Sequence, residues 1–238
     1  MTPQRPNPQP AEAERAERIL TAARELLLAW GYKRVTVDEI ARRARVGKGT
    51  VYLHWKTKEI LFGELLREEF ADVLTHVAEQ VQQNPDLARP STLVRATFLQ
   101  QTQRPLARAI HTSDDDILGG LATTFDGHPI AQELGHHALL SGLTAVWRRH
   151  GLLTPGFTDA EVIYLIDAVL SGFLGGGAAV PPGDAPAPDQ CANLLRLTIQ
   201  GAVEATPPPA EPAVRAAAQD IVDLLFRTRE ASAPASVD

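Results

Sequence analysis

The chain has 238 residues, 44% of them hydrophobic, so it can bury a sizeable core without disulfides or a structural metal. A single cysteine, Cys191, excludes an internal disulfide, and no positively charged start leads into an apolar signal segment. The longest apolar runs break well short of a membrane span, so we expect a cytoplasmic protein with no membrane partner.

The net charge of −6 argues by itself against a nucleic-acid partner, but the charge is unevenly distributed. Residues 1–60 carry 12 Lys and Arg against 7 Asp and Glu, a net +5, and they include all four lysines. Residues 61–238 carry 11 basic and 22 acidic residues, a net −11. This asymmetry indicates a compact basic surface attached to an acidic body, although chance clustering of solvated charges produces the same pattern.

Helical periodicity runs through almost the whole chain and no segment alternates as a strand does, so the sequence predicts an all-α fold. Residues 1–10, rich in proline and polar residues, and residues 231–238 are predicted to be disordered tails. The first helix has an apolar stripe that ends at Gly31, formed by Ile19, Ala22, Ala23, Leu26 and Trp30. Further helices are predicted at 36–44, 48–54, 58–82, 91–103, 105–111, from 113, from 129 to 150, and at 159–174, 189–204 and 212–229.

Helix starts are marked by capping residues. Thr36 with Glu39 and Thr158 with Glu161 have the spacing of capping boxes. Ser113 is predicted to start a helix whose first turn holds Asp114, Asp115 and Asp116, and Pro129 another at its first position. The acidic run also suggests a metal site, but capping is the better explanation.

The segment 36–55 reads as two short helices joined by a tight turn. One helix side supplies a small core of Ile40, Ala41, Ala44, Val46, Val51 and Trp55. The rest of the second helix is left to face outward, with Lys48, Gly49, Thr50, Tyr52, Leu53 and His54. A short helix presented in this way fits the major groove of DNA, its N-terminal residues nearest the base edges.

Residues 12–62 resemble the DNA-binding domain of the TetR family. The resemblance is carried by residues 26–32 (LLLAWGY), by the helix 36–44 and by residues 46–59 (VGKGTVYLHWKTKE). It implies a ligand-responsive dimer, all-α, with a helix-turn-helix domain over 11–60 (motif 36–55) and a helical ligand-binding and dimerisation domain over 61–230. It also implies that the DNA contacts fall on Thr36, Lys48, Gly49, Thr50, Tyr52, His54 and Lys58.

The motif departs from the family pattern at three positions. Arg45 stands where glycine is usual in the turn, and a left-handed backbone there would cost about 1 kcal/mol relative to glycine. Gly47 replaces the usual Ser or Thr cap, and Trp55 replaces phenylalanine, where we expect a core anchor.

In the acidic body, the resemblance implies that the helices at 159–174 and 189–204 form a four-helix interface in a homodimer. The all-round apolar character of 159–174 favours this independently, because such a helix must be covered on both sides. Helices between 91 and 150 would enclose the pocket of an unidentified small-molecule effector. The candidate lining residues, for which ordinary core packing is an equal explanation, are Phe98, Thr102, Phe125, Trp147 and Tyr164.

No catalytic motif, cofactor motif or metal site is predicted. His136 and His137 project about 100° apart on a helix, so they cannot share one metal ion without distortion. Asp167, inside an apolar helix, is expected to make a polar contact across the dimer or to face solvent. The predicted function is that of a repressor which binds a pseudo-palindromic operator in double-stranded DNA. The alternatives are an activator, a small-molecule binding or sequestering protein without operator recognition, and a helical enzyme.

Overall fold

The computed structural model describes residues 8–122, 134–176, 180–181, 184 and 186–232. Within these ranges the protein is all-α as predicted, without a strand. The α-helices are α1 (Pro8–Trp30), α2 (Val37–Ala44), α3 (Lys48–His54), α4 (Lys58–Gln83), α5 (Pro90–Gln103), α6 (Pro105–Thr112), α7 (Asp115–Leu118), α9 (His136–Arg149), α10 (Asp159–Gly175), α11 (Pro188–Val203) and α12 (Glu211–Ala231). Two short 3₁₀ helices, η1 (Pro85–Ala88) and η2 (Gly119–Ala122), lie between them.

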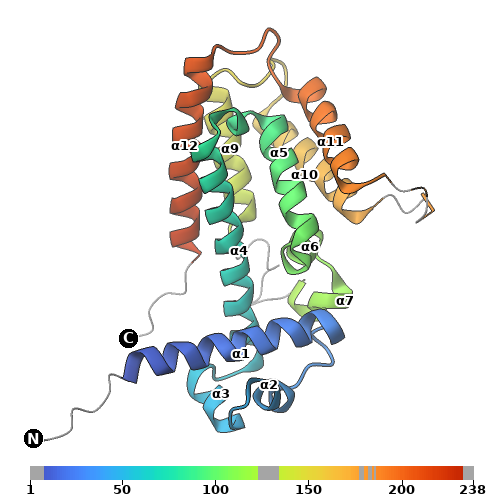
Figure 1. Cartoon of the computed structure of the whole chain (residues 1–238). Helices are drawn as coiled ribbons and strands as arrows, with labels where there is room; N and C mark the ends of the chain where they lie inside the picture. The colour runs from blue at the N-terminus through green and yellow to red at the C-terminus, as the bar shows by residue number, and fades with distance from the viewer. Residues whose placement is uncertain (1–7, 123–133, 177–179, 182–183, 185, 233–238) are drawn as a thin grey trace, which may run out of the picture.

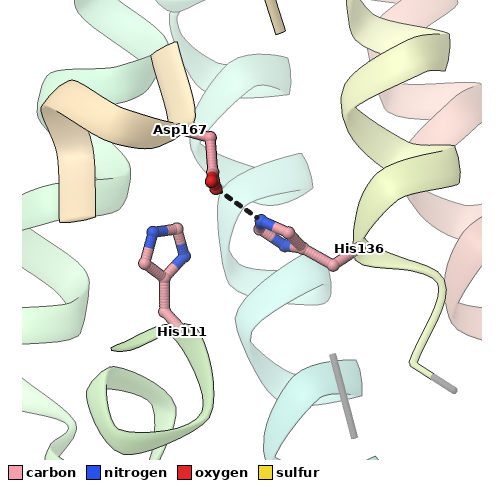
Figure 2. Close-up of side chains that lie close together, drawn as sticks. All are labelled: His111, His136 and Asp167. Atoms are coloured by element: carbon pink, nitrogen blue, oxygen red, sulfur yellow. Dashed lines mark hydrogen bonds and ion pairs between the residues drawn. The ribbon is translucent and has the colours of Figure 1, made fainter. Parts of the chain in front are cut away.

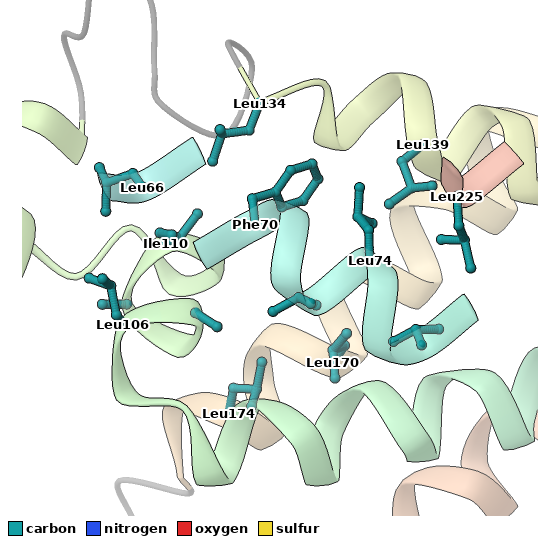
Figure 3. Close-up of a cluster of buried hydrophobic side chains, with 14 of the residues drawn as sticks. Leu66, Phe70, Leu74, Leu106, Ile110, Leu134, Leu139, Leu170, Leu174 and Leu225 are labelled. Carbon is teal, nitrogen blue, oxygen red and sulfur yellow. The ribbon is translucent and has the colours of Figure 1, made fainter. Parts of the chain in front are cut away.

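Helices α1, α2 and α3 form a small unit at one end of the molecule, and α4 rises from it into the larger body (Figure 1). The body packs around α4, with α12 along one side and α5 and α6 along another. Helices α10 and α11 lie at the outer edge opposite α12 (Figure 1). The core around α4 holds Leu66, Phe70 and Leu74, which meet Ile110 of α6 and Leu170 of α10 (Figure 3). Helix α4 therefore belongs to both parts of the molecule.

The helix ends largely follow the predicted caps. The Thr36 hydroxyl accepts from the Glu39 amide at 3.3 Å, and Thr158 with Glu161 forms a full capping box. Ser113 was predicted to start a helix, which is wrong. It ends α6 in a left-handed conformation (φ 51°), and Asp114 caps α7 by accepting from the amides of Asp116 and Ile117. A carboxylate is a strong N-cap, so the acidic run serves helix capping.

Several other expectations change. The predicted tail 1–10 overlaps α1, because the helix already begins at Pro8, while residues 1–7, Pro129 and Phe125 lie outside the described residues. Trp30, the last member of the first apolar stripe, is 37% exposed. No helix in the described part of the chain combines the length and apolar character needed to cross a membrane.

Candidate nucleic-acid interface and effector cavity

The α2–α3 pair is held by a small apolar core. Ile40, Ala41, Ala44 and Val51 are buried, and Trp55 just after α3 is 3% exposed. The Trp55 indole N–H donates to Glu64 of α4 at 2.6 Å. Trp55 is thus the anchor that the sequence predicts, and it fixes α3 against α4.

The turn between α2 and α3 is left-handed at Arg45, with φ 56° and ψ 45°. Glycine is favoured in this backbone conformation. Arginine at this position therefore lowers the free energy of unfolding by about 1 kcal/mol relative to glycine. Gly47 is the N-cap of α3 and makes no side-chain capping bond. The free N–H groups at the start of α3 therefore have no side-chain partner at the cap.

The outward side of α3 is accessible and mostly polar, with Leu53, 86% exposed, as its apolar member. Lys48, Gly49 and Tyr52 are exposed, and Thr50 and His54 are half-buried. The Lys48 amine is bound within the chain, because its Nζ lies 2.7 Å from Asp38 Oδ2 on α2. The hydrogen bond to Asp38 raises the pKa of Lys48, so the lysine is fully charged near neutral pH.

The two flanking candidates are partly engaged. Thr36 is exposed at the N-terminus of α2, but its hydroxyl bonds Glu39. The Lys58 amine donates to the Tyr32 carbonyl at 2.6 Å and lies 3.9 Å from the centroid of the Tyr32 ring. Burial lowers the pKa of Lys58. A phosphate contact by Lys58 would require it to leave Tyr32.

Two junctions connect this end of the molecule to the body. At the first, the Tyr32 amide donates to the Ile117 carbonyl of α7 at 2.8 Å, and Lys33 pairs with Asp115 at 3.0 Å. At the second, Glu69 of α4, only 2% exposed, accepts from Arg24 of α1 and lies 3.5 Å from Arg104 between α5 and α6. Helices α1, α4, α6 and α7 are therefore coupled by specific polar contacts.

An apolar cavity of about 90 Å³ lies in the body beside α4. Trp147 lines it and is fixed by donating its indole N–H to the Ala88 carbonyl at 2.8 Å. Other apolar lining residues are Phe70, Val77, Val94, Leu143, Leu170 and Leu225. A cavity of this kind suits a small apolar ligand or part of a larger one.

Of the predicted pocket residues, Trp147 lines this cavity. Phe98 is buried but packs edge-on against Phe173 with centroids 6.3 Å apart, and the Thr102 hydroxyl donates to the Leu99 carbonyl. Tyr164 is 77% exposed, which corrects its assignment to the pocket. The buried face of α10 includes Val162 and Ile166, and residue 164 is two positions from each, so it points outward.

One end of the cavity is polar. His111 from the end of α6, His136 from the start of α9 and Asp167 from α10 meet there (Figure 2). His136 Nε2 lies 3.3 Å from Asp167 Oδ1, and Ser171 Oγ lies 3.2 Å from His111 Nε2. Burial, followed by the nearby His136, lowers the pKa of His111 to about 4, so this imidazole is neutral at pH 7. The hydrogen bond from His136 lowers the pKa of Asp167, which is ionised.

The cluster bears on what the sequence predicted for Asp167. Asp167 pairs with His136 inside the same chain, and its side chain remains 47% exposed, which agrees with the expected contact with solvent. His111 was not singled out at all, because it lies 25 residues from His136 and 56 from Asp167. The sequence offered one signal for this cluster, which was the charged Asp167 within the apolar helix at 159–174.

The outer faces of α10 and α11 are apolar and uncovered in the single chain. Tyr164 is 77% exposed, and Leu194 and Leu197 of α11 are 50% and 48% exposed. A hollow of about 840 Å³ lies between the two helices, lined by Val169 and Phe173 among others. Exposed apolar side chains beside an apolar hollow are typical of protein interfaces.

Residues 19–65 match the family model described as "Bacterial regulatory proteins, tetR family". An uncharacterized HTH-type transcriptional regulator of Mycobacterium tuberculosis is 31% identical over 121 residues, which are 46% of this chain and 64% of that protein. The chain therefore matches less than two thirds of this relative's length. The HTH-type transcriptional repressor BepR of Brucella suis is 27% identical over 68% of this chain and 79% of its own.

Among solved structures, the transcriptional regulator FadR of Bacillus subtilis, in complex with stearoyl-CoA, superposes with a TM-score of 0.59. The superposition covers 77% of this chain and 96% of that chain at 19% identity, so it shows a shared fold over the body as well as the N-terminal helices. With the helix-turn-helix geometry described above, these matches show that residues 19–65 form a DNA-binding domain of the tetR family of bacterial regulatory proteins, on a chain whose fold is shared with other transcriptional regulators.

Proposed function

We propose that the chain is a ligand-responsive transcriptional repressor that binds a pseudo-palindromic operator as a homodimer. The observation that carries the proposal is the accessible polar face of α3, with Lys48 at its N-terminus and Tyr52 one turn later. It lies in a net basic segment of the chain, whereas the body is acidic. Phosphate contacts supply affinity and base contacts at the start of α3 supply specificity.

DNA binding and effector binding are assigned to different parts of the chain. Residues 11–60 are the DNA-binding domain, with contacts at Thr36, Lys48, Gly49, Thr50, Tyr52, His54 and, after rearrangement, Lys58. Residues 61–230 are the effector-binding and dimerisation domain. The dimer forms through the apolar outer faces of α10 and α11, which places two α3 helices in successive major grooves about 34–36 Å apart.

The effector enters the apolar cavity beside α4. It acts on DNA binding through the junctions of α1 with α7 and of α1 with α4, because a shift of α6 or α4 is passed on by these contacts. A ligand that switches occupancy decisively must prefer one form by about 5.5 kcal/mol, roughly 10⁴-fold. The name of BepR, a transcriptional repressor, supports repression as the sign of regulation.

The proposal is tested by selecting bound fragments from a random double-stranded DNA library and footprinting the enriched sequence. We expect an inverted repeat, with affinity lost in Lys48→Ala and Tyr52→Ala. Arg108→Ala, which removes one positive charge from an exposed position on α6, is the matched control and should bind normally. If no sequence is enriched and the two α3 variants behave as the parent does, the chain is a small-molecule binding protein without operator recognition.

A further inference from the structure

Three side chains of types that bind metal ions converge at the polar end of the cavity. One ligand atom from each of His111, His136 and Asp167 lies within 4.8 Å of the other two. Figure 2 shows both imidazole rings and the carboxylate directed into the same small space. No second group of this kind occurs in the described part of the chain. We infer that His111, His136 and Asp167 bind one divalent transition-metal ion of the zinc type.

The separations suit such an ion. Donor atoms about 2.0–2.1 Å from a tetrahedral zinc ion lie about 3.4 Å from one another. The His136 and Asp167 donors are already 3.3 Å apart. The two imidazole rings have centroids 5.0 Å apart and planes at 87°. A modest rotation of the side chains would therefore bring the His111 nitrogen within the same distance of the other two donor atoms. The three residues come from α6, α9 and α10, which fixes their backbones in a packed core.

The donor chemistry selects the class of ion. Two imidazole nitrogens and one carboxylate oxygen suit Zn²⁺, Co²⁺ or Ni²⁺, whereas Mg²⁺ and Ca²⁺ prefer sites built from oxygen alone. Asp167 supplies the negative charge that partly compensates the charge of a cation in this half-buried site. Three protein ligands leave at least one coordination position for water or for a donor atom of a ligand in the cavity.

A second observation concerns Gln101, a buried polar residue that lines the same cavities as the two histidines. Gln101 of α5 is 6% exposed, and its Oε1 is buried without a hydrogen-bond partner. Gln101 lines the apolar cavity and also a smaller one of about 40 Å³, and both histidines line the same two cavities. A buried acceptor without a donor is costly. A water molecule bound to the metal ion supplies the missing donor.

The site does not depend on DNA binding, so its test uses the full-length protein alone. The protein is freed of metal with a chelator and titrated with Zn²⁺ by calorimetry and with Co²⁺ by visible absorption. We expect one equivalent of metal per chain, with absorption bands typical of tetrahedral Co²⁺. His111→Gln, His136→Gln and Asp167→Asn should each weaken binding by at least about tenfold. Retained binding in these variants would overturn the inference, as would the absence of stoichiometric binding in the parent.

Two control variants exclude general effects of losing a histidine. His137→Gln changes an exposed neighbour on α9, and His150→Gln changes a histidine that pairs with Asp220 at 2.8 Å outside the cluster. Both should bind metal as the parent does. If one of the His111, His136 or Asp167 variants does not fold, metal binding at the site is tested by chemical modification of the parent protein. Zn²⁺ should protect His111 and His136 from diethylpyrocarbonate and leave His137 reactive, and equal reactivity with and without Zn²⁺ would contradict the site.

Discussion

Lys48 Nζ, at the N-terminus of the outward-facing helix α3, lies 2.7 Å from Asp38 Oδ2 on α2. Both side chains are at least half exposed, so the pair is solvated and the lysine can exchange the carboxylate for a DNA phosphate. In the proposed complex with DNA, the carboxylate would compete with phosphate for the same amine and would itself repel phosphate. We therefore expect Asp38 to oppose DNA binding in the free protein, although it also restricts the positions that the Lys48 side chain can adopt.

The first prediction follows from this competition. Asp38→Asn should raise the affinity for operator DNA by about two- to fivefold, because the competing partner is removed. Lys48→Ala should lower affinity on all sequences and reduce the dependence on salt by about one phosphate contact. Fluorescence anisotropy over a range of salt concentrations measures both. Asp189→Asn makes the same charge change on the body and should leave affinity unaltered, and an equal rise in that variant would assign the effect to net charge alone.

Local sequence signals predicted most of the fold because each acts within a few residues. Thr158 with Glu161 located the start of α10, and the all-α class followed from periodicity. The position of Arg45 in the motif raised the question of a left-handed turn, and the structure shows one there. The helix predicted to start at Ser113 begins two residues later, at Asp115. Ser113 and Asp114 are both good N-cap residues, and which of them caps α7 depends on where α6 ends.

The cavity and its polar end were beyond sequence reasoning for a different reason. His111, His136 and Asp167 come from three helices, and which faces of those helices meet is decided by packing. The same applies to Gln101, whose burial no local pattern indicates. Tyr164 shows the converse, because an aromatic residue in an apolar helix predicts burial, and here it lies on the outer face.

The second prediction concerns that outer face. Leu197→Glu on α11 should prevent association, because it puts a charge into the apolar surface through which we propose that the dimer forms. Sedimentation velocity should then find monomers where the parent forms dimers, and DNA affinity should fall as well. Ile60→Glu changes a residue of similar exposure (46%) at the start of α4 and should leave the dimer intact. A dimer that persists in Leu197→Glu would place the interface elsewhere.

The third prediction concerns the contact of α1 with α7. Gly31 has φ +73°, and a Cβ there would lie 2.2 Å from the Asp116 carbonyl oxygen. Gly31→Ala should therefore cost about 1 kcal/mol for the backbone conformation and at least about 1 kcal/mol more for displacing α7. Gly151→Ala is the matched control, because its φ is +69° with nothing within 4 Å. Urea denaturation compares the two, and equal losses of stability would show that α7 moves away freely.

The fourth prediction concerns the buried carboxylate of Glu69. Glu69→Gln keeps the size of the side chain but removes the charge that Arg24 and Arg104 share. The free energy of unfolding should fall by about 2 kcal/mol, less than for a fully buried pair, because both arginines reach solvent. Glu79→Gln, on the exposed side of the same helix, should change stability by less than about 0.5 kcal/mol. Similar values for the two variants would show that the network contributes little.

The last prediction tests whether the turn that aims α3 is under strain. Arg45→Gly should raise the free energy of unfolding by about 1 kcal/mol, because φ 56° is costly for arginine and free for glycine. Arg42→Gly, inside α2, should instead lower it by about 1 kcal/mol, since glycine weakens a helix interior. Chemical denaturation measures both changes. A loss of stability in Arg45→Gly would mean that the arginine side chain makes a stabilising contact larger than the strain. If Arg45→Gly stabilises the fold yet weakens DNA binding, Arg45 is itself a phosphate contact, and that contact explains why the strained residue is tolerated in the turn.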